Sequence, residues 1–268
     1  MNLKIYQVDA FTDTRYHGNP AAVCILNAPI PDLLMQQIAA EMNLGMTAFL
    51  NLEYTRYNLR WFTPVTEVSL CGHATVASAH ILWETGTALS SEELDFATRG
   101  GRITATCNDT WSQVDFPSSA PSPVDFSDEL LCDLGLSRED VAYTGKSTYD
   151  FIVQLNESAR LRTVEPVTAA LLKYECRGFI LTSPSDSPDF DFLSRFFAPS
   201  IGLPEDHVTG SSHCCLGPYW RNLTSKTTMT GYQASKRGGT ILVTPSADGS
   251  RVTIGGQSVT TAVFEMRL

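Results

Sequence analysis

Two short stretches of this 268-residue chain place a glycine directly before residues that can move protons. In "SLCGHATVASAH", His73 follows Gly72. In "EDHVTGSSHCCLGPYW", Ser211 follows Gly210, and Asp206 stands four residues before that glycine. A glycine where a strand meets a helix lets a ligand approach the backbone closely, and the first N–H groups of the helix are unpaired donors. The two stretches therefore predict a pair of anion-binding junctions that carry proton-transfer groups.

The chemistry expected of such a pair is binding of a carboxylate or stabilisation of an enolate. The helix macrodipole adds partial positive charge at each junction, so two junctions acting together need neither a metal nor a basic side chain. His73 and Asp206 would serve in proton transfer, and the Ser211 hydroxyl could donate a hydrogen bond. The expected site residues of the two junctions are His73, Asp206 and Ser211 for catalysis, and Gly72, Gly210 and Ser212 for substrate binding.

Other residues of these stretches have a simpler interpretation. A single glycine before a helix is commonly no more than a turn, and only the pairing of two such junctions favours a site. Cys71, Cys214 and Cys215 could act as nucleophiles or bases. Buried cysteines are commonly small hydrophobic residues, which is the interpretation we favour. His80 and His213 are expected to be structural histidines in or beside the helices.

Composition excludes several classes of protein. Hydrophobic residues make up 43% of the chain and charged residues 18%, as in ordered globular proteins. The net charge of -10 argues against a nucleic-acid partner. There is no apolar run of membrane-spanning length, and "MNLKIYQVDAF" alternates like a strand rather than a signal peptide, which predicts a cytoplasmic protein without membrane association. Seven cysteines without C-x-x-C spacing favour neither disulfides nor a zinc site.

The elements that must position these residues are mostly strands. An amphipathic helix is predicted over 31–43, and a helix of small residues follows Gly72 and stops at Gly86. Strands outnumber helices and do not alternate with them strictly, which favours an α+β fold over a doubly wound parallel sheet. The similar patterns around Gly72 and Gly210 indicate a weak internal duplication.

A stretch rich in serine and proline, 116–129, is the best candidate for a linker. We therefore expect two similar domains, residues 1–117 and 118–258. The last strand, 259–268, is expected to pack back on the first domain.

The chain resembles the PhzF-like family of phenazine biosynthesis, whose members are related in fold to diaminopimelate epimerase. The resemblance is carried in order by "YQVDAFTDTRYHGNPAAVCIL", "LRWFTPVTEVSLCGHATVASAHIL" and "EDHVTGSSHCCLGPYW", and it extends over nearly the whole chain. It implies two α+β domains, each a curled, mostly antiparallel sheet around a central helix, with the active site in the cleft between them. Gly72 and His73 would line one wall, and Gly210 and Ser211 the other. A homodimer and the absence of a cofactor are also implied.

One departure from the family pattern bears directly on chemistry. Where the family has "NLSETAF", this chain has "NLGMTAF" over Asn43–Phe49. The resemblance places Met46 at the position of the family's general acid/base glutamate, and Gly45 at that of the preceding serine. A thioether has no proton to transfer. His207 also replaces the proline of "EDPVTG", and we favour a loop histidine without a role.

The function expected from these observations is a cofactor-independent isomerase of a small carboxylated metabolite, of the trans-2,3-dihydro-3-hydroxyanthranilate isomerase type and active in secondary metabolism. Its substrate or reaction is expected to differ from the family's because Met46 replaces the glutamate, and proton transfer would fall to Asp206 and His73. Met46 and Gly45 complete the predicted site, which includes no metal. Two alternatives remain open: an enzyme that positions its substrate for a cyclisation or rearrangement, and a non-catalytic protein that binds a small molecule.

Overall fold

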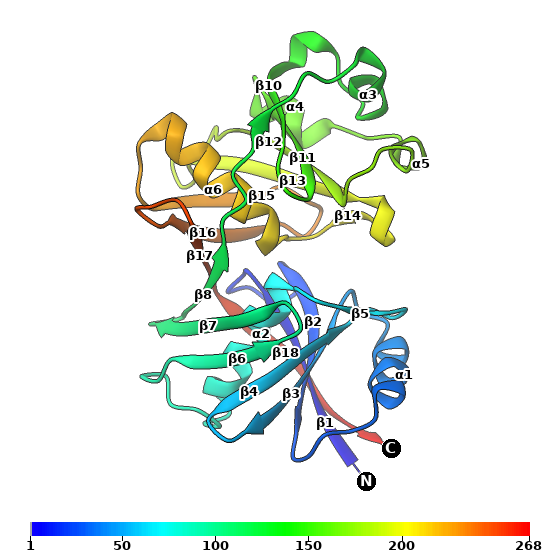
Figure 1. The fold of residues 1–268 in the computed structure, drawn as a ribbon, viewed down its shortest axis with the longest axis vertical. Coiled ribbons are helices and arrows are strands. Elements are labelled where there is room, and N and C mark those ends of the chain that lie inside the picture. Colours follow the sequence, from blue (N-terminus) through cyan, green and yellow to red (C-terminus); the bar gives the residue numbers. More distant parts are fainter. Residues whose placement is uncertain (1) are drawn as a thin grey trace. The chain divides into compact units, whose positions relative to one another are not determined.

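The computed structural model describes residues 2–268 and divides into two compact units, which are described separately (Figure 1). Unit 1 runs to Phe116 and takes up the chain again over Ile254–Leu268, and unit 2 consists of Pro117–Thr253. The last strand, β18 (Ser258–Arg267), pairs antiparallel with the first, β1 (Asn2–Ala10), so that the two ends of the described chain lie in the same unit. Among residues 2–268, no helix is long and apolar enough to span a membrane.

Unit 1 is a mixed sheet with two helices. Besides β1 and β18, its elements are β2 (Asn19–Leu26), α1 (Asp32–Met42), β3 (Thr47–Glu53), β4 (Arg56–Phe62), β5 (Glu67–Val68), α2 (Gly72–Glu84), β6 (Leu94–Thr98), β7 (Gly101–Asn108) and β8 (Trp111–Pro117). Strand β2 pairs antiparallel with β1 and parallel with β3. Strand β4 pairs antiparallel with β3 and β5 and parallel with β6, and β7 pairs antiparallel with both β6 and β8.

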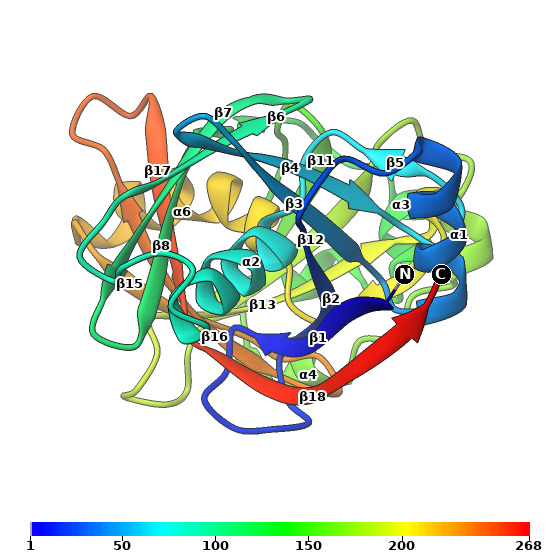
Figure 2. The ribbon, with the colours of Figure 1, turned by 90° about the horizontal axis from the view of Figure 1, so that it is seen from below.

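Helix α2 is the centre of unit 1 because its small residues let the sheet come close on several sides. Residues 72–79 of this helix are all buried, and α2 packs against β1, β2, β3 and β18. Figure 2 shows the helix enclosed by these strands. Buried hydroxyls inside the sheet need acceptors, and they find them within the helix: Thr75 donates to the Cys71 carbonyl, and Ser78 donates to the Ala74 carbonyl at 2.6 Å.

Unit 2 is likewise built of strands and helices. Its elements are β9 (Ser122–Pro123), α3 (Asp128–Asp133), η1 (Arg138–Asp140), β10 (Val141–Lys146), β11 (Asp150–Leu155), α4 (Ser158–Thr163), α5 (Thr168–Leu171), β12 (Gly178–Pro184), β13 (Phe192–Ala198), η2 (Pro199–Ile201), β14 (Leu203–Asp206), α6 (Gly210–Thr224), β15 (Met229–Gln233), β16 (Gly239–Pro245) and the first half of β17 (Arg251–Gly256), whose second half belongs to unit 1. Helix α6 packs against β16, and a Cβ on Gly217 would come within 2.8 Å of Val243 Cγ1, so only glycine allows this close approach.

The order of pairings repeats from one unit to the other. In unit 2, β11 pairs antiparallel with β10 and parallel with β12, as β2 does with β1 and β3 in unit 1. Strand β13 pairs antiparallel with β12 and β14 and parallel with β15, as β4 does with β3, β5 and β6. In each unit the short strand, β5 or β14, leads into the long helix, α2 or α6. The duplication indicated by the two glycine stretches therefore extends to the topology of both units.

The expected fold class is confirmed: each unit is α+β, with a mixed sheet in which antiparallel pairings predominate, around one long helix. The helix predicted over 31–43 is α1, which spans Asp32–Met42. It ends at Asn43, whose left-handed backbone (φ 50°) suits asparagine better than most residues. The chain passes from unit 1 to unit 2 between Phe116 and Pro117, within the serine- and proline-rich stretch 116–129.

Candidate functional site

The first junction lies where β5 leads into α2. Cys71 is the residue before the helix, with an extended backbone (φ -148°, ψ 113°), and its side chain does not cap the helix. The Cys71 thiol instead lies 3.5 Å from Nδ1 of His73, and the two side chains are only 6% and 8% exposed. Because the thiol contacts one ring nitrogen, it holds the imidazole in a defined orientation at the start of the helix. The sequence favours a small hydrophobic role for Cys71, and the structure adds this polar contact.

Met46 and Gly45 belong to the same unit and directly precede β3. The Met46 side chain is 8% exposed, and its carbonyl accepts a hydrogen bond of 3.0 Å from the Ala22 N–H, which fixes the backbone at this position. Gly45 is exposed, and a Cβ built on it would meet no heavy atom within 4 Å. The structure therefore has room for the serine that the family resemblance places at residue 45.

The second junction, in unit 2, fixes a carboxylate beside the start of α6. Asp206 ends β14, and its Oδ2 accepts a hydrogen bond of 2.5 Å from the Thr209 hydroxyl. Thr209 is the residue before the helix, and because its hydroxyl is used on Asp206, its side chain does not cap α6. The Gln233 side chain completes the turn, accepting from the Thr209 N–H at 2.8 Å and donating to the Asp206 carbonyl at 2.8 Å. The turn thus places a partly exposed carboxylate next to the N-terminus of a 15-residue helix.

The two serines after Gly210 have different surroundings. Ser211 is partly exposed, and its Oγ accepts a hydrogen bond of 2.9 Å from Nη1 of Arg177. Ser212 is 1% exposed, and its hydroxyl donates to the Thr209 carbonyl at 2.8 Å. The Ser212 side chain is therefore engaged inside the first turn of the helix, and the predicted substrate contact there concerns its backbone N–H alone.

Arg177 and Asp150, which the sequence analysis did not single out, are joined to the second junction through the bond from Arg177 to Ser211. Asp150 is 2% exposed, and Arg177 grips its carboxylate with two N–H groups, Nε to Oδ1 at 2.8 Å and Nη2 to Oδ2 at 2.5 Å. Burial raises the pKa of the Asp150 carboxyl, and the Arg177 guanidinium works against this shift. No local motif joins residues 27 positions apart, so only the pairing of β11 with β12, which sets Asp150 opposite Gly178, reveals the pair.

The other cysteine and histidine positions are consistent with structural roles. Burial raises the pKa of the Cys215 thiol, which is 1% exposed, so the thiol stays protonated. His207 is partly buried, and burial lowers its pKa while the neighbouring Asp206 opposes that shift. His213 is fully buried, and its ring lies 5.8 Å from that of Phe192.

His213 gives a prediction about stability and pH. Its Nδ1 lies 2.8 Å from the Thr209 carbonyl, so Nδ1 carries the proton, and burial lowers the pKa to about 4. In the unfolded chain the pKa is about 6.5, so the unfolded state binds more protons between these values, and stability falls as pH drops from 6.5 to 4. The difference of about 2.5 units corresponds to roughly 3 kcal/mol. In urea titrations at pH 7 and pH 4.5, His213→Gln is expected to lose less stability than the parent over this interval.

Equal losses in His213→Gln and in the parent would show that His213 is not held neutral by burial.

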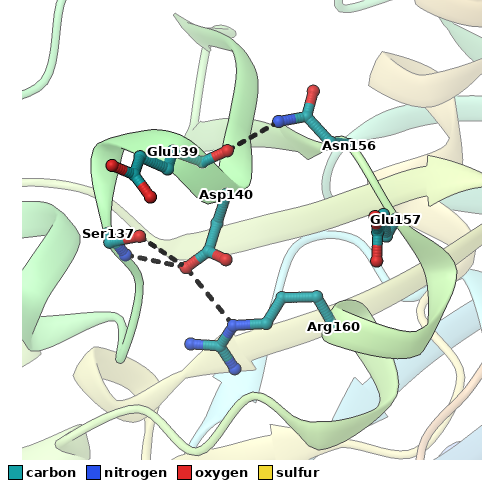
Figure 3. Close-up of a pocket in the computed structure, with 6 residues that line it drawn as sticks. All are labelled: Ser137, Glu139, Asp140, Asn156, Glu157 and Arg160. Atoms are coloured by element: carbon teal, nitrogen blue, oxygen red, sulfur yellow. Dashed lines mark hydrogen bonds and ion pairs between the residues drawn. The ribbon is translucent and has the colours of Figure 1, made fainter.

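A separate recess in unit 2 carries none of these residues. It has a volume of about 310 Å³ and is lined by Ser137, Glu139, Asp140, Asn156, Glu157 and Arg160 (Figure 3). Its side chains bond to one another and to nearby backbone: Asp140 accepts from Ser137 and pairs with Arg160 at 3.3 Å. Over residues 2–268, no three His, Cys, Asp or Glu side chains gather in a way that could hold a metal ion.

Comparison with known proteins adds the family. Residues 8–263 match the phenazine biosynthesis-like protein family, PhzC-PhzF. The chain is 45% identical to an uncharacterized isomerase of Halalkalibacterium halodurans and 42% identical to an uncharacterized isomerase of Pseudomonas aeruginosa, in each case over all of both chains. A crystal structure of a PhzF-family phenazine biosynthesis protein from Enterococcus faecalis superposes with a TM-score of 0.93 at 35% identity, again over all of both chains. With this coverage and identity, the chain belongs to the PhzC-PhzF family of phenazine biosynthesis-like proteins.

Proposed function

We propose that this protein is a cofactor-independent isomerase of a small carboxylated metabolite, with Asp206 as the main proton carrier and His73 as the second. The observation that carries the proposal is the Asp206 carboxylate, held by the Thr209 hydroxyl at 2.5 Å beside the N-terminus of α6. A fixed and partly exposed carboxylate can exchange a proton with a ligand, while the adjacent helix N-terminus favours an anionic group on that ligand.

The names of the relatives support the general class of reaction. Both bacterial relatives cited above are named isomerases. The finer assignment, to a trans-2,3-dihydro-3-hydroxyanthranilate isomerase type in secondary metabolism with an altered substrate or reaction, rests on the resemblance of the motifs and on Met46. A homodimer and a cytoplasmic location are parts of the same proposal. Light scattering tests the proposed homodimer, and a monomer at micromolar concentration would contradict this part of the proposal.

The proposal predicts a ligand class that can be measured directly. In a thermal-shift screen, small cyclic carboxylates, 3-hydroxyanthranilate among them, should stabilise the protein more than their amides do, because the helix N-termini favour the negative charge. A ligand at 100 times its Kd adds about 2.7 kcal/mol to the stability of the folded state. The melting temperature should therefore rise by well more than the noise of the method.

The control for the screen is a set of simple anions, sulfate and acetate, at the same ionic strength. If carboxylates and amides act alike, the anion-binding part of the proposal is wrong. A ligand that binds but is not turned over would favour the alternative of a non-catalytic binding protein.

A further inference from the structure

We propose that Arg177 is a positioning residue of the Asp206 junction: it occupies the acceptor side of the Ser211 hydroxyl and so directs the Ser211 proton toward the substrate. This inference rests on the proposed function, because it assigns the Ser211 O–H as a hydrogen-bond donor to the ligand. The buried Asp150 carboxylate, which accepts two hydrogen bonds from Arg177, holds the guanidinium in place.

The geometry of the guanidinium leaves it little freedom. Two of its N–H groups hold the Asp150 carboxylate, and Nη1 donates to Ser211 Oγ at 2.9 Å. The Arg177 guanidinium also lies over two aromatic rings. Its central carbon is 5.4 Å from the centroid of the Phe196 ring and 5.6 Å from the centroid of the Tyr149 ring. The Arg177 backbone N–H donates to the Tyr149 carbonyl at 2.8 Å. Side chain and backbone are therefore both fixed, as a group that orients another must be.

The bond to Ser211 determines what its hydroxyl can do. A serine hydroxyl has one proton to donate and two lone pairs to accept with, whereas a guanidinium can only donate. Arg177 must therefore be the donor, and Ser211 keeps its proton for another acceptor. Within residues 2–268, the bond from Arg177 is the one hydrogen bond that the structure gives to the Ser211 side chain, so its proton is available to a ligand or to solvent.

Charge also favours a positioning role over a plain electrostatic one. The positive charge of Arg177 is matched by the buried Asp150 carboxylate at 2.5 Å, so the pair as a whole is close to neutral. A lone arginine would attract an anion, but a neutralised one contributes mainly direction through its planar set of donors. Lysine, which has a single ammonium group, cannot hold Asp150 with a fork and reach Ser211 at the same time.

The first test needs no ligand. Removing Arg177 alone would leave Asp150 buried without its partner and can prevent folding, so the pair is replaced together, as Asp150→Leu with Arg177→Met. In a crystal structure of this variant, the Ser211 side chain should adopt another rotamer or several, while the backbone of α6 stays in place. A Ser211 Oγ that keeps the parent's position would overturn the proposal.

The second test uses the kinetic and binding effects of combined substitutions. Ser211→Ala and Arg177→Lys should each weaken binding of 3-hydroxyanthranilate, or turnover of any substrate found, by about tenfold, which is the worth of one good hydrogen bond. Adding Ser211→Ala to Arg177→Lys should cost nothing further, because both act through the same hydroxyl. Independent, multiplying losses would overturn the proposal, as would full activity in Arg177→Lys.

Arg160→Gln is the matched control, since Arg160 also pairs with a carboxylate in unit 2 but lies in the recess without site residues. It should lower stability and leave binding unchanged. If the parent neither binds 3-hydroxyanthranilate nor turns over any carboxylate, the proposed function fails, while the crystal structure still decides the role of Arg177.

Discussion

Met46→Glu is expected to create or strongly raise turnover of trans-2,3-dihydro-3-hydroxyanthranilate, the reaction type that the family resemblance implies. A positioned general acid/base contributes roughly 10²–10⁴-fold to such a reaction, which sets the upper limit of the gain. The backbone at residue 46 is held by the bond from Ala22 to its carbonyl, so a new side chain there starts from a fixed position. Steady-state kinetics of the parent and the variant give the comparison.

The low exposure of residue 46 favours this outcome chemically. Met46 is 8% exposed, and a carboxyl placed there would be partly desolvated. Desolvation raises the pKa of a carboxyl, which brings it nearer to neutral pH, where a general acid/base works best. The rate of Met46→Glu should therefore depend on pH with a midpoint above the usual range of glutamate, a signature that Met46→Gln cannot produce.

A second substitution should increase the gain. Because a Cβ on Gly45 meets no heavy atom within 4 Å, Gly45→Ser introduces the hydroxyl of the family pattern without a clash. We expect Gly45→Ser with Met46→Glu to exceed Met46→Glu alone, since the hydroxyl can help to orient the carboxylate. Gly45→Ala with Met46→Glu is the control for backbone effects.

Two results would contradict this expectation. The first is a parent that already turns over the compound as fast as relatives that have the glutamate, which would show that the acid/base is not at residue 46 or is not needed. Alternatively, Met46→Gln could gain as much as Met46→Glu, which would show that polarity rather than proton transfer is responsible.

Asp206→Asn is expected to abolish the protein's own reaction, with a loss of at least the roughly 10²–10⁴-fold that one general acid/base contributes. Asparagine can still accept the hydrogen bond from the Thr209 hydroxyl through its amide oxygen, so the turn before α6 should remain folded. What it lacks is the ionisable proton that Asp206 exchanges in the proposed function. Met46→Leu should be mild by comparison, because it replaces one apolar side chain by another.

The assay follows from the chemistry and does not require a known product. A ligand from the carboxylate screen is incubated with the protein in D₂O, and NMR follows incorporation of deuterium at carbon, which isomerisation by proton transfer produces. Glu205→Gln is the matched control: Glu205 is the adjacent carboxylate, and both its oxygens bond to Arg195, at 2.7 and 2.9 Å. It should lower stability while exchange continues. Undiminished exchange in Asp206→Asn would remove Asp206 from the mechanism.

Local sequence determined the elements and the two junctions of this protein. The amphipathic spacing of 31–43 predicts α1, and the glycines at 72 and 210 mark the first residues of α2 and α6. These signals are local because helix periodicity and helix starts depend on residues within a few positions of one another. The α+β class follows from the same information, through the excess of strands over helices.

Tertiary structure alone decided how the groups at each junction are held. Arg177 meets Asp150 and Ser211, 27 and 34 positions away, because β11 and β12 lie side by side in parallel register and α6 begins beside them. The Cys71 thiol contacts His73, although its residue type favoured a small buried hydrophobic residue over a polar role. Ser212 turns its hydroxyl into the helix while Ser211, one residue earlier, stays accessible. Contacts between distant strands, and the direction of a side chain at a helix start, depend on packing that no short stretch of sequence encodes.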